Sequence, residues 1–186
     1  MTEDHFDGEG QSIRKALMRT PIDGARLTSS FGNRKHPTLG YTKMHRGVDF
    51  GAPTGTPIFA AGDGIINFAG LNGNYGKIIR IRHRGSFKTV YAHLLKFAKG
   101  IRKGRRVYQG QVIGYVGTTG LSTGPHLHYE FRINGAPRNS RTVKLPDAKP
   151  VPDSEMARFQ KFTEQRLAQF NVFRESNQQL ALASDN

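Results

Sequence analysis

The chain has 186 residues, no cysteine and a formal net charge of +14 at pH 7. The absence of cysteine excludes disulfides, thiolate ligands and a cysteine nucleophile, so a transition metal would have to be bound by imidazole and carboxylate groups. No apolar run reaches the length of about 18 residues that spans a membrane. A chain of this length supports one domain with a sizeable core, with or without tails.

The positive charge is concentrated in the middle of the chain. Residues 11–146 contain 23 lysines and arginines but only four acidic residues. This balance predicts an anionic partner, which is either nucleic acid or an anionic polymer such as a bacterial cell wall, unless the basic face is merely solvated. The sequence has no nucleic-acid recognition motif and no tryptophan for base stacking, so we expect no specific nucleic-acid partner.

Residues 1–20 form an N-terminal segment with an acidic start. It lacks the basic and apolar regions of a signal peptide. Within it, the pattern over Gln11–Arg19 predicts a short helix that ends before Pro21. If the protein acts outside the cytoplasm, we expect this chain to be a fragment of a longer protein.

Residues 21–145 consist of short apolar runs separated by glycine-rich turns, which predicts a β domain. Regular spacing of such runs is typical of antiparallel sheets that pack against each other. The fold class is therefore mainly β, with a compact antiparallel β-sheet domain. The expected strands lie near residues 26–29, 47–50, 57–60, 64–69, 77–82, 89–94, 112–116 and 126–133.

The last part of the chain has a different pattern. A proline-containing linker over 146–153 predicts a domain boundary. Apolar residues then recur at roughly helical spacing, which predicts an amphipathic helix over 154–174 and a disordered tail over 175–186. The apolar stripe has to be buried against the β domain, a second copy or a partner domain or protein. Its members are Met156, Phe159, Leu167, Phe170 and Phe173.

The segment around His126 and His128 carries the most specific chemistry. In a strand, alternation places both imidazoles on one face together with Glu130 and Arg132, while the apolar residues between them face the core. Upstream, His45 and Asp49 form a second ligand-like set. They could share a face either as a helical i,i+4 pair or in an extended segment, and either geometry lets both reach one ion.

The candidate ligands His45, Asp49 and His128 form a set of two imidazoles and one carboxylate. Three protein ligands leave the fourth zinc position open, as in hydrolases, whereas four ligands make a closed structural site. Such chemistry also needs groups that transfer protons and stabilise the oxyanion. His93 and His126 are the candidates for these roles, although a lone histidine such as His93 is more often a core residue.

Three segments resemble the signature motifs of the M23 peptidases, the lysostaphin-type and LytM-type zinc endopeptidases of bacterial cell walls. The similarity covers roughly residues 20–145 and includes the glycine-rich turns between the motifs. It implies a compact, mostly antiparallel β domain with an active-site groove. The segments are His45-x-x-x-Asp49, Tyr91-Ala92-His93-Leu94 and Ser122-Thr123-Gly124-Pro125-His126-Leu127-His128.

The resemblance implies one Zn²⁺ ion per chain, bound by His45, Asp49 and His128. It gives His93 and His126 catalytic roles as general bases or transition-state stabilisers. It also implies substrate-binding residues in the loop that precedes the first ligand. These residues are Asn33, Arg34, His36 and Tyr41.

The function implied by the resemblance is that of a zinc-dependent endopeptidase, in which zinc-bound water attacks the amide carbonyl of peptidoglycan cross-links. The Gln11–Arg19 and Arg34–Pro37 segments resemble envelope endopeptidases of Gram-negative bacteria. This implies a periplasmic or cell-envelope location and the D-alanyl–meso-diaminopimelate bond. The alternatives are a catalytically inactive LytM-type activator of cell-wall amidases, which has lost ligand residues, and a basic envelope-binding module.

Overall fold

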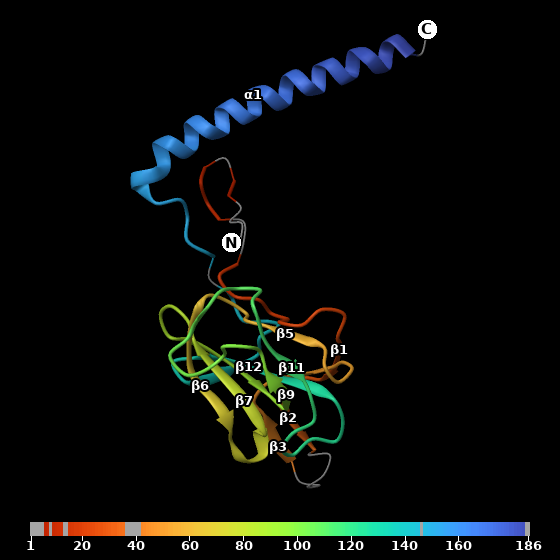
Figure 1. Ribbon diagram of the computed structural model, residues 1–186, viewed down its shortest axis with the longest axis vertical. Helices are drawn as coiled ribbons and strands as arrows, with labels where there is room; N and C mark the ends of the chain where they lie inside the picture. Colours follow the sequence, from red (N-terminus) through yellow and green to blue (C-terminus); the bar gives the residue numbers. More distant parts are fainter. Residues whose placement is uncertain (1–5, 8, 13–14, 36–41, 146, 185–186) are drawn as a thin grey trace. The chain divides into compact units, whose positions relative to one another are not determined.

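The computed structural model describes residues 6–7, 9–12, 15–35, 42–145 and 147–184 (Figure 1). Residues Leu17–Leu145 form one compact unit, and the segments on either side of it form a second unit. All residues of the predicted chemical segments that the structure describes belong to the first unit.

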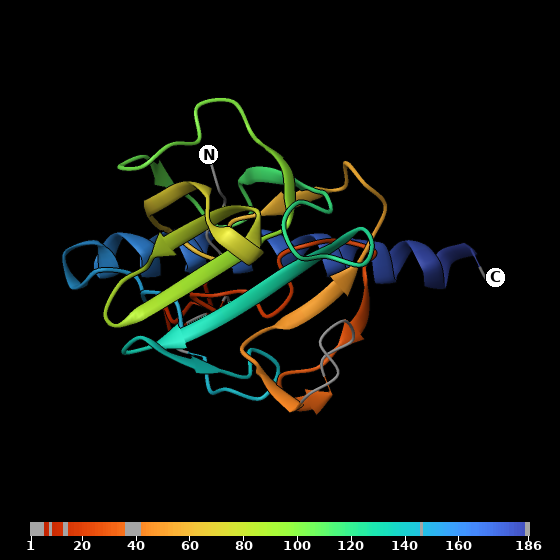
Figure 2. The ribbon, with the colours of Figure 1, turned by 90° about the horizontal axis from the view of Figure 1, so that it is seen from below.

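The first unit is built on an eight-stranded antiparallel sheet, and Figure 2 shows β12 between β4 and β8 in this sheet. Seven strands follow the order β1-β4-β12-β8-β7-β6-β10, and β13 pairs with the far end of β12. The strands are β1 (Arg26–Ser29), β4 (Val48–Gly51), β12 (His126–Ile133), β8 (Phe87–Ala92), β7 (Lys77–Arg82), β6 (Gly64–Leu71), β10 (Arg106–Val107) and β13 (Ala136–Arg138).

Two smaller sheets complete this unit. One has the order β5-β11-β9, and β2 pairs with β3 in the other. The core lies between the eight-stranded and the three-stranded sheet and contains buried apolar side chains of both. Ile79 and Leu127 come from the first, and Ile58 and Ile113 come from the second. The remaining elements are β2 (Gly32–Lys35), β3 (Thr42–His45), β5 (Pro57–Phe59), the 3-10 turn η1 (Gly73–Tyr75), β9 (Leu94–Phe97) and β11 (Val112–Val116).

The mainly β, antiparallel fold class is confirmed, and so are most of the expected strands. Four of them have the bounds that the sequence predicted, namely 26–29, 77–82, 112–116 and 126–133. The strands β2, β3, β9, β10 and β13 were not predicted. Each has four residues or fewer, a length at which alternation is only a weak signal.

The predicted helix over Gln11–Arg19 is wrong for the described part of that segment. Lys15 forms a β-bridge with Asp147 instead. Further along, the Met18 amide donates to the Ala61 carbonyl at 2.6 Å, and the Arg19 guanidinium donates to two distant carbonyls. Leu17 is buried beside residues far away in the sequence. Long-range contacts thus replace the local hydrogen bonds that a helix would need.

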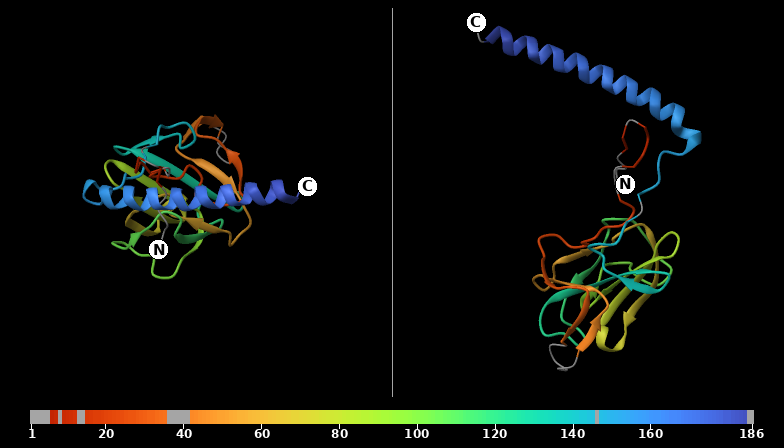
Figure 3. Two further views of the ribbon diagram at one scale, coloured as in Figure 1. Left: turned by 90° about the horizontal axis from the view of Figure 1, so that it is seen from above. Right: turned by 180° about the vertical axis from the view of Figure 1, so that it is seen from behind.

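The C-terminal helix α1 (Asp153–Ser184) is longer than predicted, and it is one continuous helix in Figures 1 and 3. The predicted disordered tail is therefore wrong up to Ser184. The helix has no Gly or Pro to stop it, and its polar residues are mostly helix formers. Apolar side chains from Phe162 to Phe173 are more than half exposed. Among the described residues, no helix has the length and hydropathy of a membrane span.

Candidate metal centre and active site

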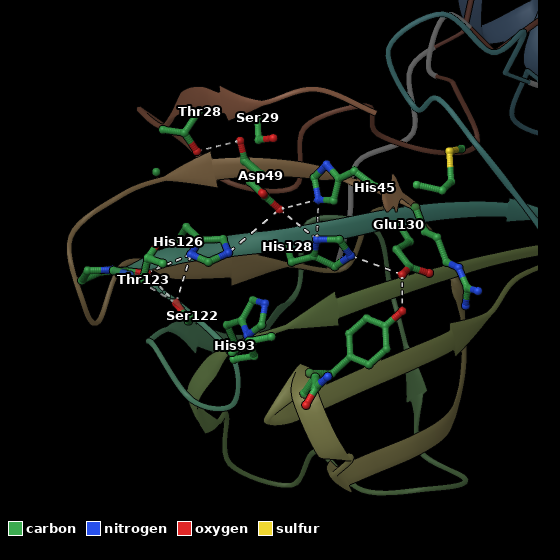
Figure 4. A pocket seen from close by; sticks show the side chains of 18 residues that line it. Thr28, Ser29, His45, Asp49, His93, Ser122, Thr123, His126, His128 and Glu130 are labelled. Atoms are coloured by element: carbon green, nitrogen blue, oxygen red, sulfur yellow. Dashed lines mark hydrogen bonds and ion pairs between the residues drawn. The ribbon is translucent and has the colours of Figure 1, made fainter. Parts of the chain in front are cut away.

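Strand pairing brings the three predicted chemical segments together. On adjacent strands β4 and β12, Asp49 lies directly opposite His128. On the other side of β12, His128 lies opposite Ala92, the last residue of β8, so that His93 follows immediately at the same sheet edge. His45 ends β3 next to them. The side chains converge on one point in Figure 4.

Three potential ligand atoms lie close together at this point. His45 Nε2 is 3.0 Å from Asp49 Oδ1 and 3.1 Å from His128 Nδ1, and the last two atoms are 2.8 Å apart. Atoms bound about 2.0–2.1 Å from one tetrahedral zinc ion lie roughly 3.3 Å from each other. The cluster therefore needs an expansion of only a few tenths of an ångström to fit zinc.

In each ligand imidazole, the nitrogen that faces away from the cluster has a hydrogen-bond partner. His45 Nδ1 lies 2.8 Å from the Ser30 carbonyl, and His128 Nε2 lies 3.2 Å from Glu130 Oε1. Each of these nitrogens donates its proton outward, which leaves a lone pair on the nitrogen that faces the cluster. Metal-binding histidines have this outer hydrogen bond as a rule. His45 Nε2, Asp49 Oδ1 and His128 Nδ1 thus face one another as three acceptors. Because acceptors repel each other, a cation between them is needed.

The pKa values of the cluster agree with this need for positive charge. Burial lowers the pKa of His128, but hydrogen bonds and charge from Asp49 and Glu130 outweigh burial and raise it to about 9. For Asp49, burial raises the pKa, and the hydrogen bonds from His128 and His45 outweigh it, leaving the pKa well below its usual range. Without a metal, a second proton on His128 supplies the cation.

Glu130 is a functional residue to which the sequence reasoning assigned no role. Its carboxylate is fully buried and accepts hydrogen bonds from His128, from the Tyr75 hydroxyl at 2.6 Å and from Arg132 Nε at 2.6 Å. Burial raises the pKa of the Glu130 carboxyl, but these partners lower it by more than burial raises it. The net pKa is below its usual range, so the group stays ionised. The signal was present, because alternation already placed Glu130 on the face of the two histidines.

His126 and His93 lie beside the ligands without completing the cluster. His126 Nδ1 is 2.8 Å from the Gly124 carbonyl, and its Nε2 is 3.9 Å from Asp49 Oδ1. His93 Nδ1 is 2.8 Å from the Thr119 carbonyl, and the His93 and His126 ring centroids are 4.7 Å apart. In each ring, Nδ1 donates to a backbone carbonyl, so Nε2 remains as an acceptor.

The backbone and environment of His93 are both unusual. Its φ is +61°, in the left-handed region that few non-glycine residues adopt. The amide donates to the Tyr75 carbonyl at 2.9 Å, which holds this conformation. Burial lowers the pKa of His93 to about 4, with a further contribution from the neighbouring imidazoles. His93 is therefore neutral at pH 7, and strain of this kind is typical of functional sites.

A cleft of about 590 Å³ opens over the cluster. Its walls include residues from β1, from the turn before β7 and from the loop before β12. Figure 4 shows labelled side chains of β1 and of the loop before β12. Of the four predicted substrate-binding residues, Asn33 is exposed on β2 and does not line the cleft. Arg34 belongs to β2, but its side chain lies outside the described part, as do His36 and Tyr41 entirely.

Comparison with known proteins gives consistent matches. The model of peptidase family M23 matches residues 43–140. Peptidoglycan DD-endopeptidase ShyC of Vibrio cholerae is 46% identical over 81% of this chain and 34% of its own length. DD-carboxypeptidase/endopeptidase Mpg of Neisseria meningitidis is 46% identical over 75% of this chain and 32% of its own length. The chain thus spans about a third of the curated relatives it matches.

Solved structures share the fold. A zinc-containing peptidase from Vibrio cholerae has a TM-score of 0.67 at 36% identity, covering 77% of this chain and 44% of that one. The catalytic domain of lysostaphin from Staphylococcus simulans has a TM-score of 0.58 at 31% identity, covering 64% of this chain and 91% of that one. The family model covers more than half of the sequence, including all five histidine and aspartate residues of the site, so the chain belongs to peptidase family M23.

Proposed function

We propose that this chain is a zinc-dependent endopeptidase that hydrolyses peptide cross-links of bacterial peptidoglycan. The observation that carries the proposal is the convergence of His45 Nε2, Asp49 Oδ1 and His128 Nδ1 within 3.1 Å at the base of an open cleft. The relatives named as peptidoglycan DD-endopeptidases support the substrate class.

The ligand set favours zinc among the common metals. Two imidazoles and one carboxylate suit Zn²⁺, whereas Mg²⁺ and Ca²⁺ prefer oxygen ligands. His45, Asp49 and His128 would hold one ion and leave a position open toward the cleft. When bound, zinc polarises a carbonyl and makes water a strong nucleophile at neutral pH.

His126 and His93 would then manage protons on the cleft side. Each presents Nε2, while its Nδ1 is fixed by a backbone carbonyl, so the rings cannot easily turn away. A neutral Nε2 can accept a proton from the attacking water. Once protonated, it can donate to the oxyanion or to the leaving amine. We assign both residues to these steps as general bases and transition-state stabilisers.

The substrate bond and the location are the finer parts of the proposal. The DD-endopeptidase names of the relatives support the D-alanyl–meso-diaminopimelate bond, and a substrate in the cell wall supports a location in the periplasm or envelope. We keep Asn33, Arg34, His36 and Tyr41 as proposed substrate contacts. For Asn33, this requires a peptide longer than the cleft, because the residue lies outside the cleft lining. The inactive-activator alternative requires lost ligands, and here all three are present.

The test is digestion of purified diaminopimelate-type sacculi by the zinc-loaded protein, followed by mass spectrometry of the muropeptides. We expect cross-linked dimers to be converted to monomers, with the new termini at D-alanine and diaminopimelate. A chelated sample and the His126→Ala variant are the controls. Unchanged dimers in the zinc-loaded sample would refute the proposed function, and cleavage at another bond would refute only the bond specificity.

A further inference from the structure

Four basic residues lie in one row across the central sheet. Lys88 on β8 lies directly opposite Arg82 on β7 and opposite Arg132 on β12. Beyond Arg82, the row continues through Ile65 on β6 to Arg106 on β10. We call Arg82, Lys88, Arg106 and Arg132 the cationic row. Figure 2 shows the strands β12 and β8 that begin it lying side by side.

The cationic row lies on the same face of the sheet as the metal centre. Residues directly opposite each other in antiparallel strands project from the same face. Along β12, Arg132 alternates onto the face of His128 and Glu130, and its guanidinium contacts the Glu130 carboxylate. Arg132 is four residues beyond His128, or roughly 13 Å along the strand. The row therefore continues from the cleft floor across the sheet.

The stability of the fold does not explain this arrangement. Directly opposed side chains are roughly 5 Å apart at Cβ, and like charges at that distance destabilise a sheet. Within the part of the chain that the structure describes, Glu130 pairs with Arg132, and the other three members of the row have no acidic partner. Arg82, Lys88 and Arg106 are exposed. Three strands, β7, β8 and β10, thus contribute charge to a surface without an internal counter-charge.

We propose that the cationic row binds free carboxylates of the peptidoglycan stem peptides that adjoin the cross-link held in the cleft. This inference rests on the proposed function, and it names a second contact on the same substrate. The row begins next to Glu130, which lines the cleft, so an extended peptide leaving the cleft along β12 reaches it after about four residues. Flexible, exposed lysine and arginine side chains suit carboxylates on a mobile polymer.

The experiment compares binding and cleavage for two variants of equal charge. The row variant is Arg82→Gln with Lys88→Gln. The control variant is Lys96→Gln with Lys99→Gln, which removes two exposed charges, one on β9 of the three-stranded sheet and one just after it. Each pair is made in the His126→Ala background for binding to sacculi, and in the wild-type background for cleavage of soluble cross-linked muropeptide dimers. Sacculi whose carboxyl groups have been converted to amides, and a duplex DNA, are the additional ligands.

We expect the row variant to bind sacculi about fivefold more weakly at low salt, the control variant to stay within twofold of the parent, and the difference to vanish at high salt. Amidated sacculi should bind the parent as weakly as native sacculi bind the row variant. Soluble dimers carry the same stem carboxylates, so the row variant should cleave them with a raised KM. An unchanged circular dichroism spectrum shows that the row variant folds. Equal losses in both variants would overturn the proposal in favour of net charge alone.

Two further results would also overturn it. Full binding of the parent to amidated sacculi would show that the row does not recognise carboxylates. Weakened DNA binding by the row variant, with sacculus binding unchanged, would assign the row to nucleic acid. If wild-type protein fails to cleave the soluble dimer, the proposed function fails, whereas the binding difference between the two variants is measured independently of cleavage.

Discussion

The buried carboxylate of Glu130 should control how tightly the metal centre binds zinc. The perturbation is Glu130→Gln, which keeps the shape of the side chain and removes its charge. In the wild type, the carboxylate accepts from His128 on one oxygen and from Arg132 on the other. An amide has only one acceptor oxygen, so either His128 or Arg132 must face an NH₂ group.

The expected magnitude follows from the role of this contact. Loss of an outer hydrogen-bond partner of a metal ligand lowers metal affinity by about 10-fold to 100-fold. This corresponds to roughly 1.4–2.7 kcal/mol of binding free energy. His128 is the most affected ligand, because its Nε2 proton would lose an ionised acceptor and the lone pair of Nδ1 would no longer be held toward Asp49 and His45.

The assay is a competition titration of zinc between the protein and a chelator of known affinity, at fixed pH. Two controls separate this role from general effects. Asp63→Asn removes one charge from a loop carboxylate that does not contact the cluster, and it should leave the affinity within twofold. Tyr75→Phe removes one donor to Glu130 and keeps the carboxylate, so its loss should be smaller than that of Glu130→Gln. Zinc affinity unchanged in a folded Glu130→Gln protein would refute the reasoning.

Three further predictions concern other parts of the account. His128→Ala should lose zinc at micromolar chelator while His126→Ala keeps one zinc per chain and loses turnover, and equal zinc retention in both would contradict the division of roles. The pKa of metal-free His128 is raised to about 9, and zinc must displace the second proton of this imidazole. Zinc affinity should therefore rise by about tenfold per pH unit between pH 7 and 9. A pH-independent affinity in the competition titration would be inconsistent with this cluster. Burial lowers the pKa of His83 below its ordinary value of 6.5, so the unfolded chain binds the proton first, and the stability present above pH 6.5 is lost as the pH falls through the folded pKa. Urea unfolding of zinc-free protein should show a smaller loss of stability on acidification in His83→Gln than in the wild type, whatever the absolute stability of the variant.

Much of the site could be predicted from local pattern. The alternation over residues 126–133 placed His126, His128 and Glu130 on one face, and the strand registers confirm it. The register that sets Asp49 opposite His128 could not be predicted, because it depends on pairing between strands 79 residues apart in the chain. The left-handed backbone of His93 also has no local signal, since contacts from the loops hold it.

The two segments that were predicted to be helical, by contrast, differ from what the local pattern predicted. Local propensity predicted a helix over Gln11–Arg19, but long-range hydrogen bonds of Met18 and Arg19 determine the structure there. At the C-terminus, polar composition after residue 174 was interpreted as disorder. The absence of Gly and Pro up to Ser184 was the better signal, because an established helix continues at little cost until a breaker stops it.

The most direct test of the central claim is an anomalous difference map, measured at the zinc absorption edge, from crystals of the zinc-loaded protein. We predict one peak per chain, at about 2.0–2.2 Å from His45 Nε2, Asp49 Oδ1 and His128 Nδ1, with no fourth protein ligand. A peak bound by other residues, or no peak between these three atoms at full zinc loading, would contradict the assignment of the metal centre.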